Sequence, residues 1–178
     1  MAYKGTWGTY YHIPKCGGIS IKYYLKSHYR DPGDYTGGGK QHRLPEAADD
    51  LTKAFTFVRH PADWLLSFYA YYEFMGWNWP ELPEEIADMF RFAEGLFWPM
   101  FVKTVTEKKP GIVGDVFDLY CLPGVTVYHL EDIQNIFGED IGLKNVMEIK
   151  PVMTAAHRAM ICEAEKDTLL RYGYDNKG

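Results

Sequence analysis

The chain has 178 residues, of which 47% are hydrophobic and 16% aromatic, and it carries a formal net charge of -5. This length and composition predict one globular domain, 1–178, with a sizeable buried core, and they exclude a disordered chain. Because the net charge is negative, the composition offers no general surface for polyanions, and we expect no nucleic-acid partner.

Cysteine usage and hydropathy indicate the compartment. Cys16, Cys121 and Cys162 form neither a disulfide framework nor a zinc-binding pattern, which favours a reducing environment and predicts no bound metal. The first residues lack the apolar stretch of a signal peptide, and no window approaches the roughly 18 apolar residues of a membrane span. We therefore expect a cytoplasmic protein without a membrane partner, and its oligomeric state stays open.

The first predicted elements are a strand and a helix separated by a short turn. Residues 6–13 are rich in β-branched and aromatic side chains and predict a strand, which Pro14 ends. After a pair of glycines, apolar residues recur at helical spacing as far as His28. Prolines and glycines then predict a loop over 30–40, and a short helix is predicted over 44–51.

The rest of the chain alternates strands with helices. The predicted elements are strands over 54–58 and 125–129, and helices over 62–77, in proline-broken pieces over 79–109, over 131–137 and over 154–172. This alternation predicts a P-loop-like α/β fold of three layers, in which helices flank a central, mostly parallel sheet. Such sheets bind ligands at the carboxyl ends of their strands, where Lys15 and Arg59 fall.

One segment with binding chemistry joins the first predicted strand to its helix: His12-Ile13-Pro14-Lys15-Cys16-Gly17-Gly18-Ile19-Ser20. Glycines let the backbone approach a ligand closely, and the free N–H groups of a helix's first turn attract anions. Lys15 adds a positive charge, and Ser20 adds a hydroxyl. The logic is that of a P-loop, although this lysine precedes the glycines, whereas the Walker lysine follows them. The alternative is that the glycines only make the turn.

A second such segment, 55–61 (Phe-Thr-Phe-Val-Arg-His-Pro), places Arg59 directly after a buried strand. Ser67 follows Arg59 by eight residues, and eight residues correspond to about two helical turns. A guanidinium can grip a phosphate with two hydrogen bonds, and a hydroxyl can add a third. The alternative is that Arg59 forms an ion pair with an acid such as Asp63 and that the serine has no role.

Together the two segments resemble the nucleotide-binding motifs of sulfotransferases that use 3′-phosphoadenosine-5′-phosphosulfate (PAPS). The resemblance is strongest to the carbohydrate sulfotransferases and their short bacterial and viral relatives, whose first motif commonly reads His-Ile-Pro-Lys-Thr-Gly-Gly-Thr-Ser. The order of the motifs, their strand contexts and the interval from Arg59 to Ser67 all match. Residues 125–133 and 167–174 resemble that family's later strand and C-terminal helix, whereas 71–122 do not align.

By position, the resemblance implies that Lys15 contacts the 5′-phosphosulfate and assists the leaving group. The residues implied to cradle that group, through backbone N–H groups or a hydroxyl, are Cys16, Gly17, Gly18, Ile19 and Ser20. Arg59 and Ser67 are implied to hold the 3′-phosphate. Two cradle residues, Cys16 and Ile19, stand where threonines are usual, and the missing hydroxyl at position 19 weakens binding by about 1 kcal/mol.

Transfer of a sulfuryl group to a hydroxyl needs a base for the acceptor's proton, and histidine is the usual base near neutral pH. We assign this role to His42, in the stretch Lys40-Gln41-His42-Arg43-Leu44, where relatives often carry a Lys-His pair. The alternative is a solvent-exposed loop histidine. His12 is expected to be a packed strand-end residue, and Glu46 and Asp49 are expected to form a solvated acidic face of a helix.

The expected acceptor is a hydroxyl of a carbohydrate or a small alcohol. Aromatic residues crowded into 69–79 can stack on a sugar ring, although core packing explains them equally well. Two other functions stay open. An ATP- and Mg²⁺-dependent kinase or phosphotransferase is disfavoured because no Lys-Ser/Thr pair follows the glycines. A non-catalytic nucleotide-binding module on the same fold is kept open by the residues at positions 16 and 19.

Overall fold

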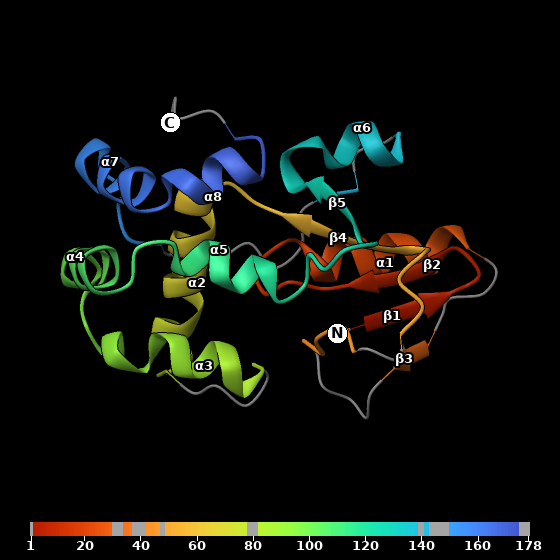
Figure 1. Ribbon diagram of the computed structural model, residues 1–178, viewed down its shortest axis with the longest axis horizontal. Helices are drawn as coiled ribbons and strands as arrows, with labels where there is room; N and C mark the ends of the chain where they lie inside the picture. The colour runs from red at the N-terminus through yellow and green to blue at the C-terminus, as the bar shows by residue number, and fades with distance from the viewer. Residues whose placement is uncertain are drawn as a thin grey trace. The chain divides into compact units, whose positions relative to one another are not determined.

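The computed structural model describes residues 2–29, 34–36, 42–46, 49–77, 82–138, 141–142 and 150–174 (Figure 1). The chain divides into two compact units, each described by itself. The first unit comprises Met1–Arg59, Glu81–Pro83 and Phe117–Val146 and holds the sheet; the second comprises His60–Pro80, Glu84–Val116 and Met147–Gly178 and is helical. The predicted α/β mixture is confirmed, and the single domain over 1–178 stays a prediction.

A five-stranded sheet is the centre of the first unit as far as the structure describes it. Its strands are β1 (Ala2–Gly5), β2 (Gly8–Tyr11), β3 (Asp34–Thr36), β4 (Ala54–Val58) and β5 (Thr126–His129), in the order β3-β1-β2-β4-β5. β2 is parallel to β4 and β4 to β5, whereas β1 pairs antiparallel with both β2 and β3. Only β1 therefore runs against the other strands, and the predicted mostly parallel sheet is confirmed. The P-loop-like character of the fold stays a prediction.

The first strand predicted from the sequence is in fact one arm of a hairpin. Residues 6 and 7 form the turn between β1 and β2, whose end residues Gly5 and Gly8 face each other in the ladder. Gly8 has a φ of 126°, and a Cβ there would lie 2.1 Å from the carbonyl oxygen of Lys53. The strand predicted over 6–13 was therefore wrong at both ends, because the observed strand covers only Gly8–Tyr11. The turn between Gly5 and Gly8 was not recognised within a run of aromatic residues.

Two further predictions are corrected between β2 and β4. The loop predicted over 30–40 contains β3, which pairs with β1. The helix predicted over 44–51 is absent from residues 44–46 and 49–51, the part of it that the structure describes. Side-chain hydrogen bonds, described below, hold those residues in place of a helical ladder.

Helices and aromatic rings complete the first unit. α1 (Gly18–His28) follows β2, and a 3₁₀ turn, η2 (Leu130–Asp132), leads from β5 into α6 (Ile133–Phe137). The ring of Tyr10 on β2 lies 5.3 Å from that of Phe55 and 6.1 Å from that of Phe57 on β4, centroid to centroid. Contacts between aromatic rings thus join the two strands whose carboxyl ends carry the candidate site.

The second unit is built from helices. They are α2 (Pro61–Phe74), α3 (Glu84–Phe90), the 3₁₀ turn η1 (Arg91–Ala93), α4 (Trp98–Lys108), α5 (Ile112–Asp118, whose last two residues belong to the first unit), α7 (Ala155–Ala164) and α8 (Lys166–Arg171). α7 packs against both α2 and α4.

The helix α5 was not predicted. Pro99 lies in the first turn of α4, where a proline is tolerated, so it does not break that helix. In the ranges that the structure describes, no helix has the length and apolar character needed to cross a membrane.

The aromatic residues after position 68 contribute to the core of the second unit. The ring of Tyr69 lies 5.1 Å from that of Trp98 and 5.0 Å from that of Phe101, and Trp77 lies 5.7 Å from Phe101. Tyr69 and Trp77 are buried, while Phe74 is exposed. Core packing therefore accounts for these two rings, and Trp79 lies outside the described residues.

A buried carboxylate divides the helix predicted over 154–172. Glu165 stands between α7 and α8, is 2% exposed and accepts the backbone N–H groups of Val113 at 3.0 Å and Gly114 at 3.3 Å. The hydroxyl of Thr168 also donates to it at 2.7 Å. Burial raises the pKa of the Glu165 carboxyl, against these three hydrogen bonds. The carboxylate thus satisfies N–H groups that the first turn of α5 leaves without helical partners.

Candidate functional site

The turn that carries Lys15 follows β2 directly. The N–H of Cys16 donates to the carbonyl of Ile13 at 3.2 Å, and Lys15 has a φ of 63°. Pro14 is the second residue of this turn, and Lys15, with its positive φ, is the third. This is the pattern of a type II turn, in which the third residue is normally glycine. A left-handed conformation costs a residue with a side chain about 1–2 kcal/mol. Lys15 therefore has a backbone conformation that glycine adopts at a lower cost in free energy.

The helix after this turn begins without a cap. Gly17, at φ 72°, precedes α1, and within the described residues no side chain caps the helix and no acid stands in its first turn. A Cβ on Gly17 would lie 2.6 Å from Cδ1 of Leu130, so the turn after β5 packs directly on this glycine. The first N–H groups of α1 and the charge of Lys15 make this end of the sheet suited to an anion. Ser20, the third residue of α1, is 1% exposed.

His12 lies against the first turn of α1. A Cβ on Gly18 would lie 2.0 Å from Nε2 of His12, so only glycine leaves room for this ring. The His12 side chain is 6% exposed, and its Nδ1 has no hydrogen-bond partner among the described residues. Burial, with smaller contributions from His42 and Lys15, lowers the pKa of His12 well below its ordinary value. His12 was expected to be a packed strand-end residue, but its contact with Gly18 was not predicted.

His42 is a buried residue, not an exposed loop histidine. Its side chain is 7% exposed, and its ring lies 4.6 Å from that of His12, centroid to centroid. Its Nδ1 lies 3.2 Å from the carbonyl oxygen of His12, and the Tyr120 hydroxyl donates to the carbonyl of His42 at 2.9 Å. A carbonyl only accepts, so the hydrogen sits on Nδ1 and Nε2 keeps its lone pair. No feature of the sequence connects Tyr120 with His42, because 78 residues separate them.

Burial keeps the His42 imidazole neutral. It lowers the pKa of His42 to about 3; the hydrogen bond to His12 opposes this effect and the charge of Lys15 adds to it. The tautomer and the charge state together leave Nε2 as a proton acceptor.

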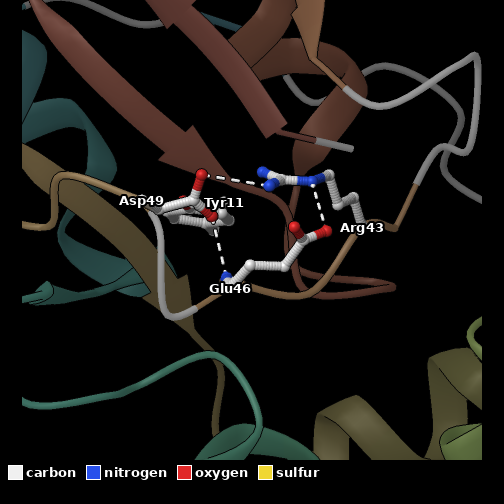
Figure 2. Close-up of polar contacts among 4 residues, drawn as sticks. All are labelled: Tyr11, Arg43, Glu46 and Asp49. Atoms are coloured by element: carbon white, nitrogen blue, oxygen red, sulfur yellow. Dashed lines mark hydrogen bonds and ion pairs between the residues drawn. The ribbon is translucent and has the colours of Figure 1, made fainter.

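The residues after His42 form a polar cluster around Asp49 (Figure 2). Oδ1 of Asp49 accepts Nη2–H of Arg43 at 3.0 Å, and Oδ2 accepts the Tyr11 hydroxyl at 2.7 Å and the backbone N–H of Glu46 at 2.8 Å. Arg43 also donates from Nε to the Glu46 carboxylate at 3.2 Å. The expected acidic helix face is therefore wrong: Asp49 is engaged by three donors, and only Glu46 is exposed.

Arg59 and Ser67 fall in different units. Arg59 follows β4 in the first unit. Burial raises the pKa of the Cys16 thiol well above its ordinary value, and the positive charge of Arg59 partly opposes this effect. Asp63, the acid considered as its partner, pairs instead with Arg158 at 2.7 Å. Ser67 lies on α2 in the second unit and is 7% exposed. A joint grip of Arg59 and Ser67 on one phosphate stays a prediction.

The first unit thus brings together Lys15, the cradle residues 16–20, Arg59 and His42 around the carboxyl ends of β2 and β4. In the ranges that the structure covers, no three His, Cys, Asp or Glu side chains cluster so as to hold a metal ion. An open hollow of about 760 Å³ lies in the second unit, between α4, α7 and α8, and none of the predicted site residues lines it. Comparisons with models of protein families, with curated proteins and with solved structures found no match.

Proposed function

We propose that this chain is a PAPS-dependent sulfotransferase that transfers a sulfuryl group to a hydroxyl of a carbohydrate or small alcohol. The observation that carries the proposal is Lys15, a lysine in a left-handed position directly before the uncapped N-terminus of α1. Strain of this kind is retained where the side chain has a task. A cation beside free N–H groups supports the binding of an anionic group.

The residues of the first unit divide the work of the transfer. Lys15 and the first N–H groups of α1 bind the phosphosulfate end of the donor. Lys15 neutralises the charge that develops on the bridging oxygen as its bond to sulfur breaks. The acceptor oxygen forms the new bond to sulfur, and its proton goes to Nε2 of His42. The products are the sulfate ester and 3′,5′-bisphosphoadenosine.

His42 becomes a better base when the donor is bound. In the free protein its pKa is about 3, chiefly because the ring is buried and to a lesser degree because of the charge of Lys15. An anion beside the imidazole favours the protonated form and offsets the charge of Lys15. The base is therefore weak without donor and stronger with it.

The three cysteines are free thiols, which supports a cytoplasmic location for the reaction.

The first experiment measures thermal unfolding with added 3′,5′-bisphosphoadenosine, ADP, or ATP with Mg²⁺. At about 100 times its dissociation constant, a ligand stabilises the folded state by roughly 2.7 kcal/mol. We expect this shift with the 3′-phosphorylated nucleotide alone, and its loss in Arg59→Ala. Arg91→Ala is the matched control, because Arg91 is an exposed arginine of the second unit that pairs with Glu84 and Asp88.

The remaining outcomes separate the alternatives. A shift with ATP and Mg²⁺ but none with the bisphosphate contradicts the sulfotransferase and favours a kinase. Binding of the bisphosphate without sulfuryl transfer to any of a panel of glycans and small alcohols favours a non-catalytic module. Transfer that is lost in both Lys15→Met and His42→Gln supports the assigned roles.

A further inference from the structure

The segment that carries His42 is held by side chains. Residues 42–46 have no regular secondary structure, so no helical or strand ladder fixes them. Asp49 supplies the attachment: its carboxylate receives donors from Arg43, from the backbone of Glu46 and from Tyr11 on β2 (Figure 2). Two of these donors belong to the segment itself and the third to the sheet. Asp49 therefore ties the segment to the strand.

Two consecutive residues at the end of β2 receive this segment. The Tyr11 hydroxyl bonds to Asp49, and the His12 carbonyl accepts Nδ1–H of His42. Tyr11 is itself anchored, because its carbonyl accepts the hydroxyl of Thr56 on β4 at 2.7 Å. The same strand end leads into the Lys15 turn. The position of the His42 ring relative to Lys15 thus depends on two attachments to the end of β2, in addition to the bond from the Tyr120 hydroxyl to the His42 carbonyl.

The Asp49 attachment is charge-assisted and partly shielded from water. The side chains of Arg43 and Asp49 are 16% and 22% exposed. Burial alone would raise the pKa of Asp49, but the bonds from Arg43, Tyr11 and Glu46 lower it below its ordinary value. Burial and the bond to Asp49 also raise the pKa of Tyr11. An ionised carboxylate with three donors therefore persists at neutral pH, and such hydrogen bonds are about twice as strong as neutral ones.

We propose that Asp49 is a positioning residue for the base His42: through Arg43, Glu46 and Tyr11 it holds the segment where Nδ1 of His42 reaches the His12 carbonyl. That bond sets the tautomer of the imidazole. This inference rests on the proposed function for its kinetic consequence only. It does not require Asp49 to touch donor or acceptor. It also explains why a carboxylate so close in sequence to the base is not itself a base.

The test uses Asp49→Asn and Tyr11→Phe, each of which removes part of the attachment and preserves side-chain size. We expect kcat for sulfuryl transfer to fall about 10- to 100-fold, because a displaced catalytic group loses alignment, while the KM for PAPS changes less than about twofold. Long-range ¹H–¹⁵N spectra are expected to show the Nδ1–H tautomer of His42 in the wild type and a mixture of tautomers in the variants. Asp50→Asn is the matched control, because in the part of the chain that the structure describes the Asp50 carboxylate accepts hydrogen bonds from Thr52 and none from the segment around His42.

The two readouts separate the two proposals. If no variant and no wild-type sample transfers sulfuryl groups, but the His42 tautomer shifts in Asp49→Asn and Tyr11→Phe, the function fails and the positioning role stands. If the wild type is active and both variants keep its kcat and its His42 spectrum, the positioning role is overturned. Should Asp49→Asn fail to fold, Tyr11→Phe decides alone.

Discussion

Glu165 in the second unit and His12 in the first are buried titratable side chains that each lie beside the first turn of a helix containing a glycine. They differ in whether their polar atoms have hydrogen-bond partners. In the second unit Glu165 accepts three hydrogen bonds, and Gly114 leaves room for its partner Thr168. In the first unit Gly18 leaves room for His12, whose Nδ1 has no partner among the described residues. The Glu165 carboxylate is thus satisfied within the protein, whereas the described residues give the buried Nδ1 of His12 no partner.

Three features that are unfavourable for folding lie close together in the first unit. Lys15 in a left-handed turn, the uncapped start of α1 and the buried His12 nitrogen all lie between β2 and the first turn of that helix. Each is unfavourable for folding alone, and such features persist at sites where a ligand completes them. Glu165 is a capping device for stability. The comparison predicts that equal damage to the two regions will have unequal effects on binding.

The largest expected effect comes from adding one methyl group in each region. In Gly18→Ala the new Cβ would lie 2.0 Å from His12, and in Gly114→Ala it would lie 2.3 Å from the Thr168 hydroxyl. Both clashes are expected to lower the free energy of unfolding by about 2–3 kcal/mol. Urea denaturation measures the loss in each variant.

Ligand binding distinguishes the two alanine variants. Calorimetric titration with 3′,5′-bisphosphoadenosine is expected to show lost binding in Gly18→Ala and unchanged affinity in Gly114→Ala, below the temperature at which either unfolds. Equal affinity in both variants would contradict the placement of the ligand at the start of α1.

The buried His42 of the first unit makes the stability of the protein depend on pH. The pKa of His42 is about 3 in the folded state and about 6.5 in an unfolded chain. A lowered histidine pKa means that the folded state binds fewer protons, so this contribution to stability is present above pH 6.5 and is lost as the pH falls towards 3. At pH 5 the loss amounts to about 2 kcal/mol.

Urea denaturation at pH 7 and pH 5 measures this loss. The stability of the wild type should drop by about 2 kcal/mol more between the two pH values than that of His42→Gln. His28→Gln, at an exposed histidine of α1, is the matched control for the substitution itself. Parallel curves for wild type and His42→Gln would mean that the imidazole is not buried as a neutral group.

The smallest expected effect is a gain in stability. Lys15→Gly removes the side chain from a left-handed position and should raise the free energy of unfolding by about 0.5–1 kcal/mol, after the entropy of the added glycine is subtracted. Lys15→Ala keeps the strain and should show no gain. Both variants should lose sulfuryl transfer, so a Lys15→Gly protein that is more stable and still active would refute the role of Lys15.

Local patterns predicted the parts of this protein that local forces form. β4 was predicted over 54–58 and observed as Ala54–Val58, and the turn from strand to helix at the two glycines was found where their backbone freedom is used. Lys15 became a candidate through its place between a strand and two glycines, whereas His42 was chosen through the resemblance to the sulfotransferases. The N-terminal hairpin was missed, because two glycines and an aromatic turn look locally like one continuous strand.

The environment of the candidate site was decided by tertiary structure alone. Asp49, Tyr120 and the carbonyl of His12 reach the segment around His42 from positions 6 to 78 residues away in sequence, and no periodicity encodes such hydrogen bonds. Likewise, Glu165 interrupts a helix because its carboxylate is needed at the start of α5. Local sequence patterns determined the strand β4 and the turn from strand to helix that carries Lys15. Burial and long-range hydrogen bonds, which exist only once the chain is folded, decided the tautomer and charge of that base.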